Sequence, residues 1–190
     1  MLLAPKIDGR VLRVLKDAGD SAFPGEVLLE LDPTDAKLAI GQAQPALQAE
    51  LRKLRLDALP ESDAAFLAHL PAVDSVAQAR ANLELAEKDF ARIEEEMKRG
   101  VGSVQTLDTA RTKAKVAKVG VDLAETEARV TLAHARRLQS ALDDAEDRLR
   151  ETQLRAPVPD DWPAWSAVLG AAANPIRYSV AARMVSKGAT

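Results

Sequence analysis

Apolar residues recur with a heptad-like period over residues 107–152. The spacing between successive apolar positions alternates between three and four residues, which is typical of a helix that winds in a left-handed coiled coil with another helix. At 1.5 Å per residue, this helix is expected to be roughly 70 Å long. Its many alanines predict close packing against a neighbouring helix. The seam positions are Leu107, Ala110, Ala114, Ala117, Val121, Ala124, Ala128, Thr131, Ala135, Leu138, Leu142, Ala145, Leu149 and Thr152.

A second, shorter heptad arm precedes this one in the chain. Residues 98–103 join the two arms, and their glycines are expected to end one helix while Ser103 caps the next. A short link between two heptad helices predicts an antiparallel hairpin, with residues 76–97 paired to residues 107–128 and the tip at about 98–103. The seam of the shorter arm comprises Val76, Ala79, Leu83, Ala86, Phe90, Ile93 and Met97.

The helical pattern begins earlier in the chain but is interrupted. Residues 36–58 carry a weaker apolar seam and are expected to pair with residues 131–152. Pro45 predicts a kink in this segment or a later start of its helix. Two prolines bracket a break at about 60–72, which is expected to bulge near the middle of the hairpin. The weaker seam comprises Ile40, Ala43, Leu47, Leu51, Leu54 and Ala58.

Short strands are predicted before the helices. Residues 5–32 are rich in Val and Leu and contain glycine turns at residues 17–20 and 24–25. Asp32 or Thr34 is then expected to cap the first helix. The sequence therefore predicts a mainly α protein in which a long antiparallel helical hairpin is inserted into a partial β domain.

The expected organisation has three parts. Residues 1–33 form the β part, residues 34–153 form the hairpin, and residues 154–190 form a tail whose structure the sequence does not predict.

Composition narrows the function classes. The net charge is −3 with a pI of about 5.5, and no basic face stands out, which argues against nucleic-acid binding. The absence of cysteine excludes disulfides and thiolate metal sites. His69 and His134 lack the spacing of metal ligands, and no catalytic fingerprint is present. We therefore expect no metal, no cofactor and no enzymatic activity.

The chain also carries no apolar run of the length that a signal peptide or a membrane span requires. We therefore expect neither an export signal nor a membrane anchor within it.

The stretch GRVLRVLKDAGDSAFPGEVLLELD resembles the first half of the biotinyl/lipoyl-like domain of HlyD-type periplasmic adaptors, which are membrane fusion proteins. DPTDAKLAIGQAQ is similar to the family's entry into its hairpin, and LRAP at 154–157 to its exit, so the resemblance covers about residues 5–157. Ala22 stands where a Val is usual. The matching positions are Gly9, Val11, Val14, Gly19, Asp20, Gly25, Leu28, Leu31 and Asp32.

The tip of the hairpin carries the candidate site. In efflux adaptors an Arg–Leu–Ser pattern at the tip contacts the outer-membrane channel. Arg92 and Ser103 match the Arg and the Ser, while Glu96 stands in the Leu position with Met97 beside it. The resemblance implies partner docking at Arg92, Met97 and Ser103. The residues alone favour the interpretation of Arg92 as a solvated flank of the coiled coil and of Ser103 as a plain helix cap. Only with the resemblance do docking and these plain roles become equal alternatives.

The tail after Pro157 does not match the family. The second half-domain typically opens with Asp-Gly, whereas this chain continues with VPDDWPAWSAVLGAAANPIRYSVAARMVSKGAT. Without the second half-domain that the resemblance implies, the early strands are expected to keep unpaired edges, which is unfavourable for a monomer. Two hypotheses remain open: a reading frame altered at this point, or a genuine divergent C-terminus with two locally packed tryptophans.

The resemblance implies a periplasmic adaptor associated with the inner membrane. Such a protein links an inner-membrane transporter to an outer-membrane channel in tripartite efflux or type I secretion, as a homo-oligomer and without chemistry of its own. Two other classes stay open. One is a stand-alone coiled-coil interaction protein that self-associates through its Ala/Leu seam. The other is a carrier-type lipoyl or biotinyl domain, which would be modified on a lysine.

Overall fold

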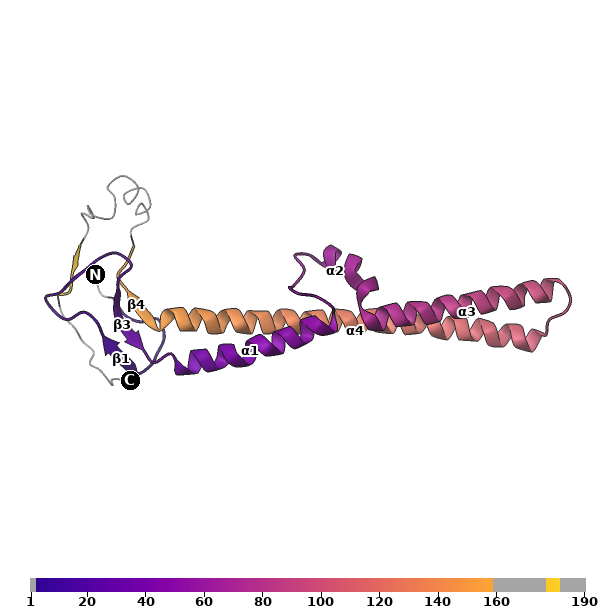
Figure 1. Ribbon diagram of the computed structural model, residues 1–190, viewed down its shortest axis with the longest axis horizontal. Helices are drawn as coiled ribbons and strands as arrows, with labels where there is room; N and C mark the ends of the chain where they lie inside the picture. The colour runs from indigo at the N-terminus through magenta and orange to yellow at the C-terminus, as the bar shows by residue number, and fades with distance from the viewer. Residues whose placement is uncertain (1–2, 159–176, 182–190) are drawn as a thin grey trace, which may run out of the picture. The chain divides into compact units, whose positions relative to one another are not determined.

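The computed structural model describes residues 3–158 and 177–181, which are mainly helical and also carry two small sheets (Figure 1). This confirms the prediction of a mainly α protein with a small β part. The chain divides into two compact units. The first unit contains residues 1–42 and 141–190, and the second contains residues 43–140.

A three-stranded antiparallel sheet forms the core of the first unit. The strand order is β1-β3-β4, so the central strand is paired along both edges. Val11 from one edge and Leu29 and Leu31 from the centre bury their side chains together, which satisfies the alternation that the Val/Leu-rich run predicts. The strands are β1 (Val11–Val14), β3 (Val27–Leu31) and β4 (Gln153–Arg155).

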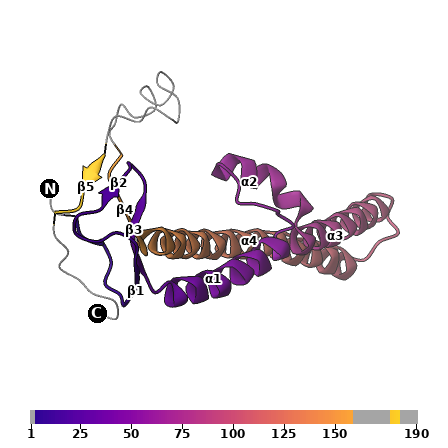
Figure 2. The ribbon, with the colours of Figure 1, turned by 60° about the vertical axis from the view of Figure 1, so that its left-hand side comes forward.

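A second, two-stranded sheet pairs β2 (Ser21–Ala22) with β5 (Tyr178–Ser179), as Figure 2 shows. The prediction that the early strands keep unpaired edges is therefore wrong for β2 and for β3. The pairing of β3 arises because the chain leaves the last helix directly into β4, where the N–H of Leu31 donates to the carbonyl of Thr152 (2.7 Å). The two hypotheses on the tail fall mostly on residues 159–176 and 182–190, outside the described residues.

The first helix, α1 (Thr34–Lys53), begins at the predicted cap. A carboxylate oxygen of Asp32 accepts hydrogen bonds from the N–H of Thr34 (3.0 Å) and from its hydroxyl (2.5 Å). These two hydrogen bonds, chiefly the one from the hydroxyl, hold the pKa of Asp32 below its ordinary value. Pro45 does not delay the helix, which runs through it. The arm ends at Lys53, so Ala58, which the seam pattern includes, lies exposed in the following loop.

The predicted break contains two short helices that fold onto the last helix. Ser62 caps the first of them by accepting a hydrogen bond from the N–H of Ala65 (3.2 Å). Phe66 and Leu70 point inward from these helices, and each is 2% exposed. The two helices are α2 (Asp63–His69) and the 3₁₀ helix η1 (Leu70–Ala72).

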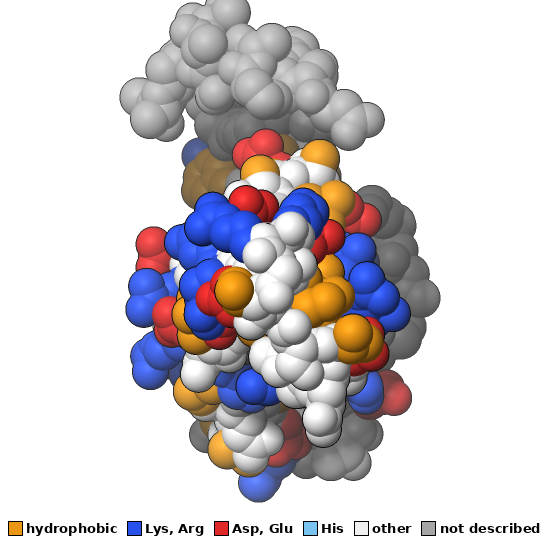
Figure 3. All heavy atoms as spheres, turned by 90° about the vertical axis from the view of Figure 1, so that its right-hand side faces the viewer, with side chains coloured by type: hydrophobic (Ala, Val, Ile, Leu, Met, Phe, Trp, Pro, Cys, Tyr) orange, Lys and Arg blue, Asp and Glu red, His pale blue; other side chains and the backbone are white. Residues whose placement is uncertain are grey.

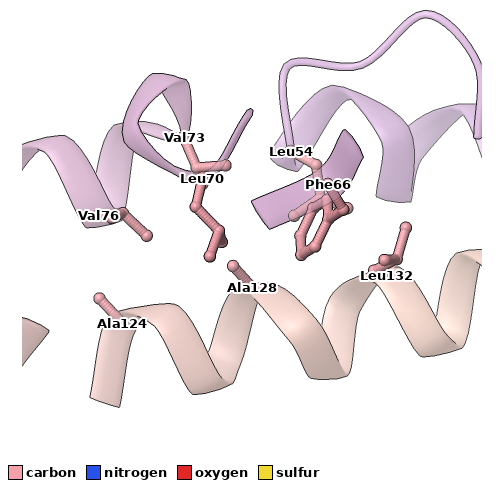
Figure 4. Packing of buried hydrophobic residues seen from close by; sticks show 8 residues of the cluster. All are labelled: Leu54, Phe66, Leu70, Val73, Val76, Ala124, Ala128 and Leu132. Carbon is pink, nitrogen blue, oxygen red and sulfur yellow. The ribbon is translucent and has the colours of Figure 1, made fainter. Parts of the chain in front are cut away.

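These side chains form the apolar core of the second unit, here called the break cluster (Figure 4). The heptad pattern places Thr131 in the seam, but the residue buried here is Leu132, at 4% exposed. The reason is that α2 approaches the helix beside its seam and covers the neighbouring position. The cluster consists of Leu54, Phe66, Leu70, Val73, Val76, Ala124, Ala128 and Leu132.

Two long helices complete the second unit: α3 (Asp74–Lys98) and α4 (Val104–Glu151), whose residues up to Ser140 belong to this unit. Arg80 pairs with Glu125 (2.8 Å), and Arg111 lies over the ring of Phe90 (5.9 Å). The order of the contacts reverses between the helices, so α3 and α4 run antiparallel. The predicted pairing of residues 76–97 with 107–128 is confirmed.

Candidate functional site

The tip between α3 and α4 is a tightly hydrogen-bonded loop. Gly100 has a φ of +78°, in the left-handed region. Its N–H donates to the carbonyl of Met97 (3.0 Å), and the N–H of Val101 donates to the carbonyl of Glu96 (3.1 Å). This pair of bonds is the Schellman arrangement that ends a helix with a glycine. The loop is therefore defined by its own backbone before any partner binds.

Met97 packs inside this loop. A Cβ added at Gly102 would lie only 2.8 Å from the Cγ and from the Sδ of Met97, so the loop backbone rests directly on that side chain. Met97 is accordingly half-buried. Of the predicted docking residues, Met97 thus supports the shape of the tip and offers only part of its side chain to a partner.

Arg92 lies exposed on α3, with ion pairs to its own helix. Its guanidinium lies 3.3 Å from a carboxylate oxygen of Asp89 and 3.2 Å from one of Glu96. The carboxylate in the family's Leu position is therefore paired to the arginine of the same pattern. A partner at this point would meet a solvated ion pair, which is worth little by itself in water.

Ser103 immediately precedes α4. Its carbonyl accepts the N–H of Leu107 (3.1 Å), which starts the helix. Within the part of the chain that the structure describes, the Ser103 hydroxyl makes no hydrogen bond of its own, so it remains available to a partner. The structure brings Met97 beside Gly102 at the tip, and it places Arg92 on α3, set back from the loop.

A groove of about 410 Å³ runs between α3 and α4 just behind the tip. Its walls combine charge, hydroxyl groups and small apolar side chains, a mixture suited to a polar protein surface rather than to a buried small molecule. Arg92 and Asp89 lie on one side, and Lys113 lies on the other. The lining residues are Ala86, Asp89, Arg92, Ile93, Gln105, Thr106, Thr109, Ala110 and Lys113.

Two exposed valines at the tip were missed by the sequence reasoning. Val101 is 78% exposed and Val104 is 64% exposed. Figure 3, in which the tip faces the viewer, shows apolar side chains there between basic and acidic ones. The available signal was an apolar residue directly after the helix-ending glycine. Neither Val101 nor Val104 belongs to the heptad seam, so neither has a helix to pack on.

The described residues contain no group of three or more metal-ligating side chains. None of the described helices combines the length and the apolar character needed to cross a membrane.

The chain is 32% identical over 167 residues to the fatty acid resistance protein FarA of Neisseria gonorrhoeae. The alignment covers 82% of this chain and 40% of that protein, so the chain spans less than half the length of this curated relative. No protein-family model matches the chain.

Two solved structures of adaptor proteins are similar to this chain at low sequence identity. The periplasmic adaptor protein EmrA is 19% identical, with a TM-score of 0.38, over 98% of this chain and 67% of its own. MacA from Actinobacillus actinomycetemcomitans is 16% identical, with a TM-score of 0.40, over 80% of this chain and 38% of its own.

Proposed function

We propose that this chain is the hairpin-bearing part of a HlyD-type periplasmic adaptor, a membrane fusion protein of a tripartite efflux or type I secretion system. It links an inner-membrane transporter to an outer-membrane channel and acts at the inner-membrane side of the periplasm. The β strands represent part of a lipoyl-like domain, and α1, α3 and α4 form the coiled-coil hairpin inserted into it. No catalytic step is assigned to the chain.

The observation that carries this proposal is the tip. Val101 lies outward on the loop whose backbone is fixed by Gly100, and Val104, the first residue of α4, is exposed beside it. In this proposal, the two exposed apolar side chains at the preformed turn form the contact surface for the channel. The free hydroxyl of Ser103 adds a polar group at the same place.

The similarity to FarA supports the same assignment. That relative is named for resistance to fatty acids. We propose that the system served by this chain likewise removes an amphipathic toxic compound. The substrate itself would not contact the tip, because the groove behind the tip is open and polar.

The seam argues against a stand-alone protein that self-associates through its alanines. Ala110, Ala124 and Ala128 are each at most 7% exposed, and Ala124 and Ala128 lie in the break cluster of the same chain. These positions are already occupied by the chain's own side chains.

The absence of cysteine makes the tip directly testable. Val101→Cys places one reactive thiol on the loop, and Ser140→Cys places one at the other limit of the second unit. Each variant is treated with a short thiol-to-amine crosslinker in the presence of the purified outer-membrane export channel of the same cells, in detergent. We expect an adduct of chain plus channel with Val101→Cys and none with Ser140→Cys.

Equal crosslinking of both variants, or no adduct from either, would contradict tip docking. A second pair of variants tests the chemistry of the contact. Val101→Asp should abolish the adduct formed from a Ser103→Cys background, whereas Val130→Asp should leave it unchanged.

A further inference from the structure

The helix α4 is apolar on two nearly opposite faces. One face is the buried seam toward α3. On the other face, four large apolar side chains follow one another at spacings of three, four and seven residues, and all of them are more than half exposed. With 3.6 residues per turn, these side chains share a single stripe. The stripe consists of Val116 (66% exposed), Val119 (64%), Leu123 (58%) and Val130 (64%).

Charged residues flank this stripe in two columns. The first column runs Asp108, Lys115, Asp122, Arg129, with a spacing of seven and alternating sign. The second column runs Lys113, Gly120, Glu127, again with a spacing of seven, from positive through neutral to negative. All the charged members are exposed, and only Arg129 forms an ion pair among the described residues, to Glu125 at 3.7 Å.

When two copies of a helix pair antiparallel, each flanking column lies beside the same column of the second copy, and the two columns run in opposite directions. In each column of α4, the charges of one copy then lie beside opposite charges of the second copy. About a two-fold axis at Val119, Lys115 meets Asp122 of the second copy, and Lys113 meets Glu127 of the second copy. Asp108 meets Arg129 of the second copy by the same rule. The symmetry repeats each contact, so no charged member of either column faces a like charge.

The apolar stripe fits the same axis. Val119 meets its own counterpart, and Val116 meets Leu123 of the second copy. Further out, Val130 of the second copy falls at the level of Thr109. A shallow hollow of about 620 Å³ lies there, lined by Val104, Gln105, Asp108, Thr109, Thr112 and Lys113.

A parallel pairing of the same faces is less favourable. In a parallel pair, a residue of the first column on one helix lies near a residue of the second column on the other helix, five positions further along the sequence. Asp122 would then meet Glu127 and Lys115 would meet Gly120, so the pair of Asp108 with Lys113 would be the one attractive contact between the columns. The pattern of charge thus discriminates between the two orientations.

We propose that the outer face of α4 is a self-recognition surface on which two copies of this chain form an isologous, antiparallel dimer centred on Val119. The dimer directs the two tips in opposite directions, so it is distinct from tip docking and does not depend on the proposed export role. One dimer cannot present both of its tips to one channel.

The first test is sedimentation equilibrium of the full chain at low salt. We expect a dimer that weakens as salt is raised, because its flanking contacts are exposed ion pairs. Lys115→Glu should weaken the dimer by at least about tenfold, since it creates like-charge contacts on both sides of the axis. Lys115→Glu combined with Asp122→Lys should restore it. Circular dichroism confirms that each variant keeps its helices.

The second test uses the absence of cysteine. Val119→Cys should oxidise to a disulfide-linked dimer, because the axis brings the two thiols together. Val130→Cys, equally exposed on the same stripe but far from its counterpart in the second copy, should form no disulfide-linked dimer under the same conditions. A monomeric wild-type chain at tens of micromolar, a failure of the double charge swap to restore association, or equal oxidation of both thiol variants would overturn the proposal.

Discussion

The second unit contains two regions that share helices but differ in how they are held. The break cluster buries large side chains almost completely, with Phe66 at 2%, Leu54 at 1% and Val76 at 0% exposed. Toward the tip, the seam residues Phe90 and Leu107 are only half-buried. One region has a thick core, and the other is a two-helix contact whose charged pairs lie in solvent.

This difference separates stability from recognition. Burial of large apolar side chains supplies most of the folding free energy, and the break cluster is where the second unit has them. The tip obtains its shape from backbone hydrogen bonds instead, at Gly100 and Val101. Apolar side chains remain exposed there because the two-helix geometry leaves nothing to cover them.

The largest expected effect follows from removing the centre of the break cluster. Phe66→Ala should lower the free energy of unfolding by about 3–4 kcal/mol, because it deletes a fully buried ring that α4 cannot collapse to fill. Urea unfolding followed by circular dichroism measures the change. Leu67→Ala, on the same short helix but 50% exposed, is the matched control and should change stability by less than about 0.5 kcal/mol. Similar losses in both variants would show that α2 is not anchored as described.

A smaller effect is expected at the tip. Gly100→Ala forces a side chain into the left-handed region at φ +78° and should cost about 1 kcal/mol. Gly120→Ala provides a control of opposite sign, because Gly120 lies inside α4 and an added Cβ meets no atom within 4 Å. That substitution should stabilise the helix by roughly 0.5–1 kcal/mol.

Amide hydrogen exchange measures where in the second unit Gly100→Ala lowers the stability. In Gly100→Ala, exchange should accelerate at Val101 and at the end of α3, and it should remain unchanged in the break cluster. Uniform acceleration throughout the second unit would instead mean that the tip and the cluster unfold as one cooperative element.

Heptad spacing predicted the pairing of α3 with α4, because the seam that recurs with a 3.5-residue period is the one that is buried between the two helices. The contact between Arg80 and Glu125 fits the predicted register. The pattern did not predict that Phe66 and Leu70 would fold back onto α4, since the order of short helices in a proline-bracketed break depends on tertiary contacts. That contact also moved burial from Thr131 to Leu132.

The sequence also predicted the β part incompletely. Turn residues located the early strands, but the three residues of β4 are too few to carry a strand pattern of their own. Their pairing with β3 comes from where the chain emerges after Thr152. At the tip, the sequence predicted the loop and the glycine that ends α3, but the predicted cap by the Ser103 side chain is not formed in the described residues. The outward direction of Val101 depended on the detailed geometry of the turn.

The smallest expected effect concerns a carboxylate between the arms. The pKa of Glu50 lies below its ordinary value, chiefly because the Lys53 ammonium donates a hydrogen bond to it at 2.8 Å; desolvation opposes this lowering, and nearby His134 adds to it. A lowered folded pKa contributes stability above the unfolded pKa of Glu, near 4.5, and this contribution is lost as pH falls through the folded value. Glu50→Gln should therefore destabilise the second unit by about 0.5 kcal/mol at pH 7 and by progressively less below pH ~4.5.

Glu87→Gln, which removes a carboxylate without an ion pair among the described residues, is the control. Thermal unfolding across this pH range measures both variants, and a pH-independent loss in Glu50→Gln would assign its effect to packing rather than to charge.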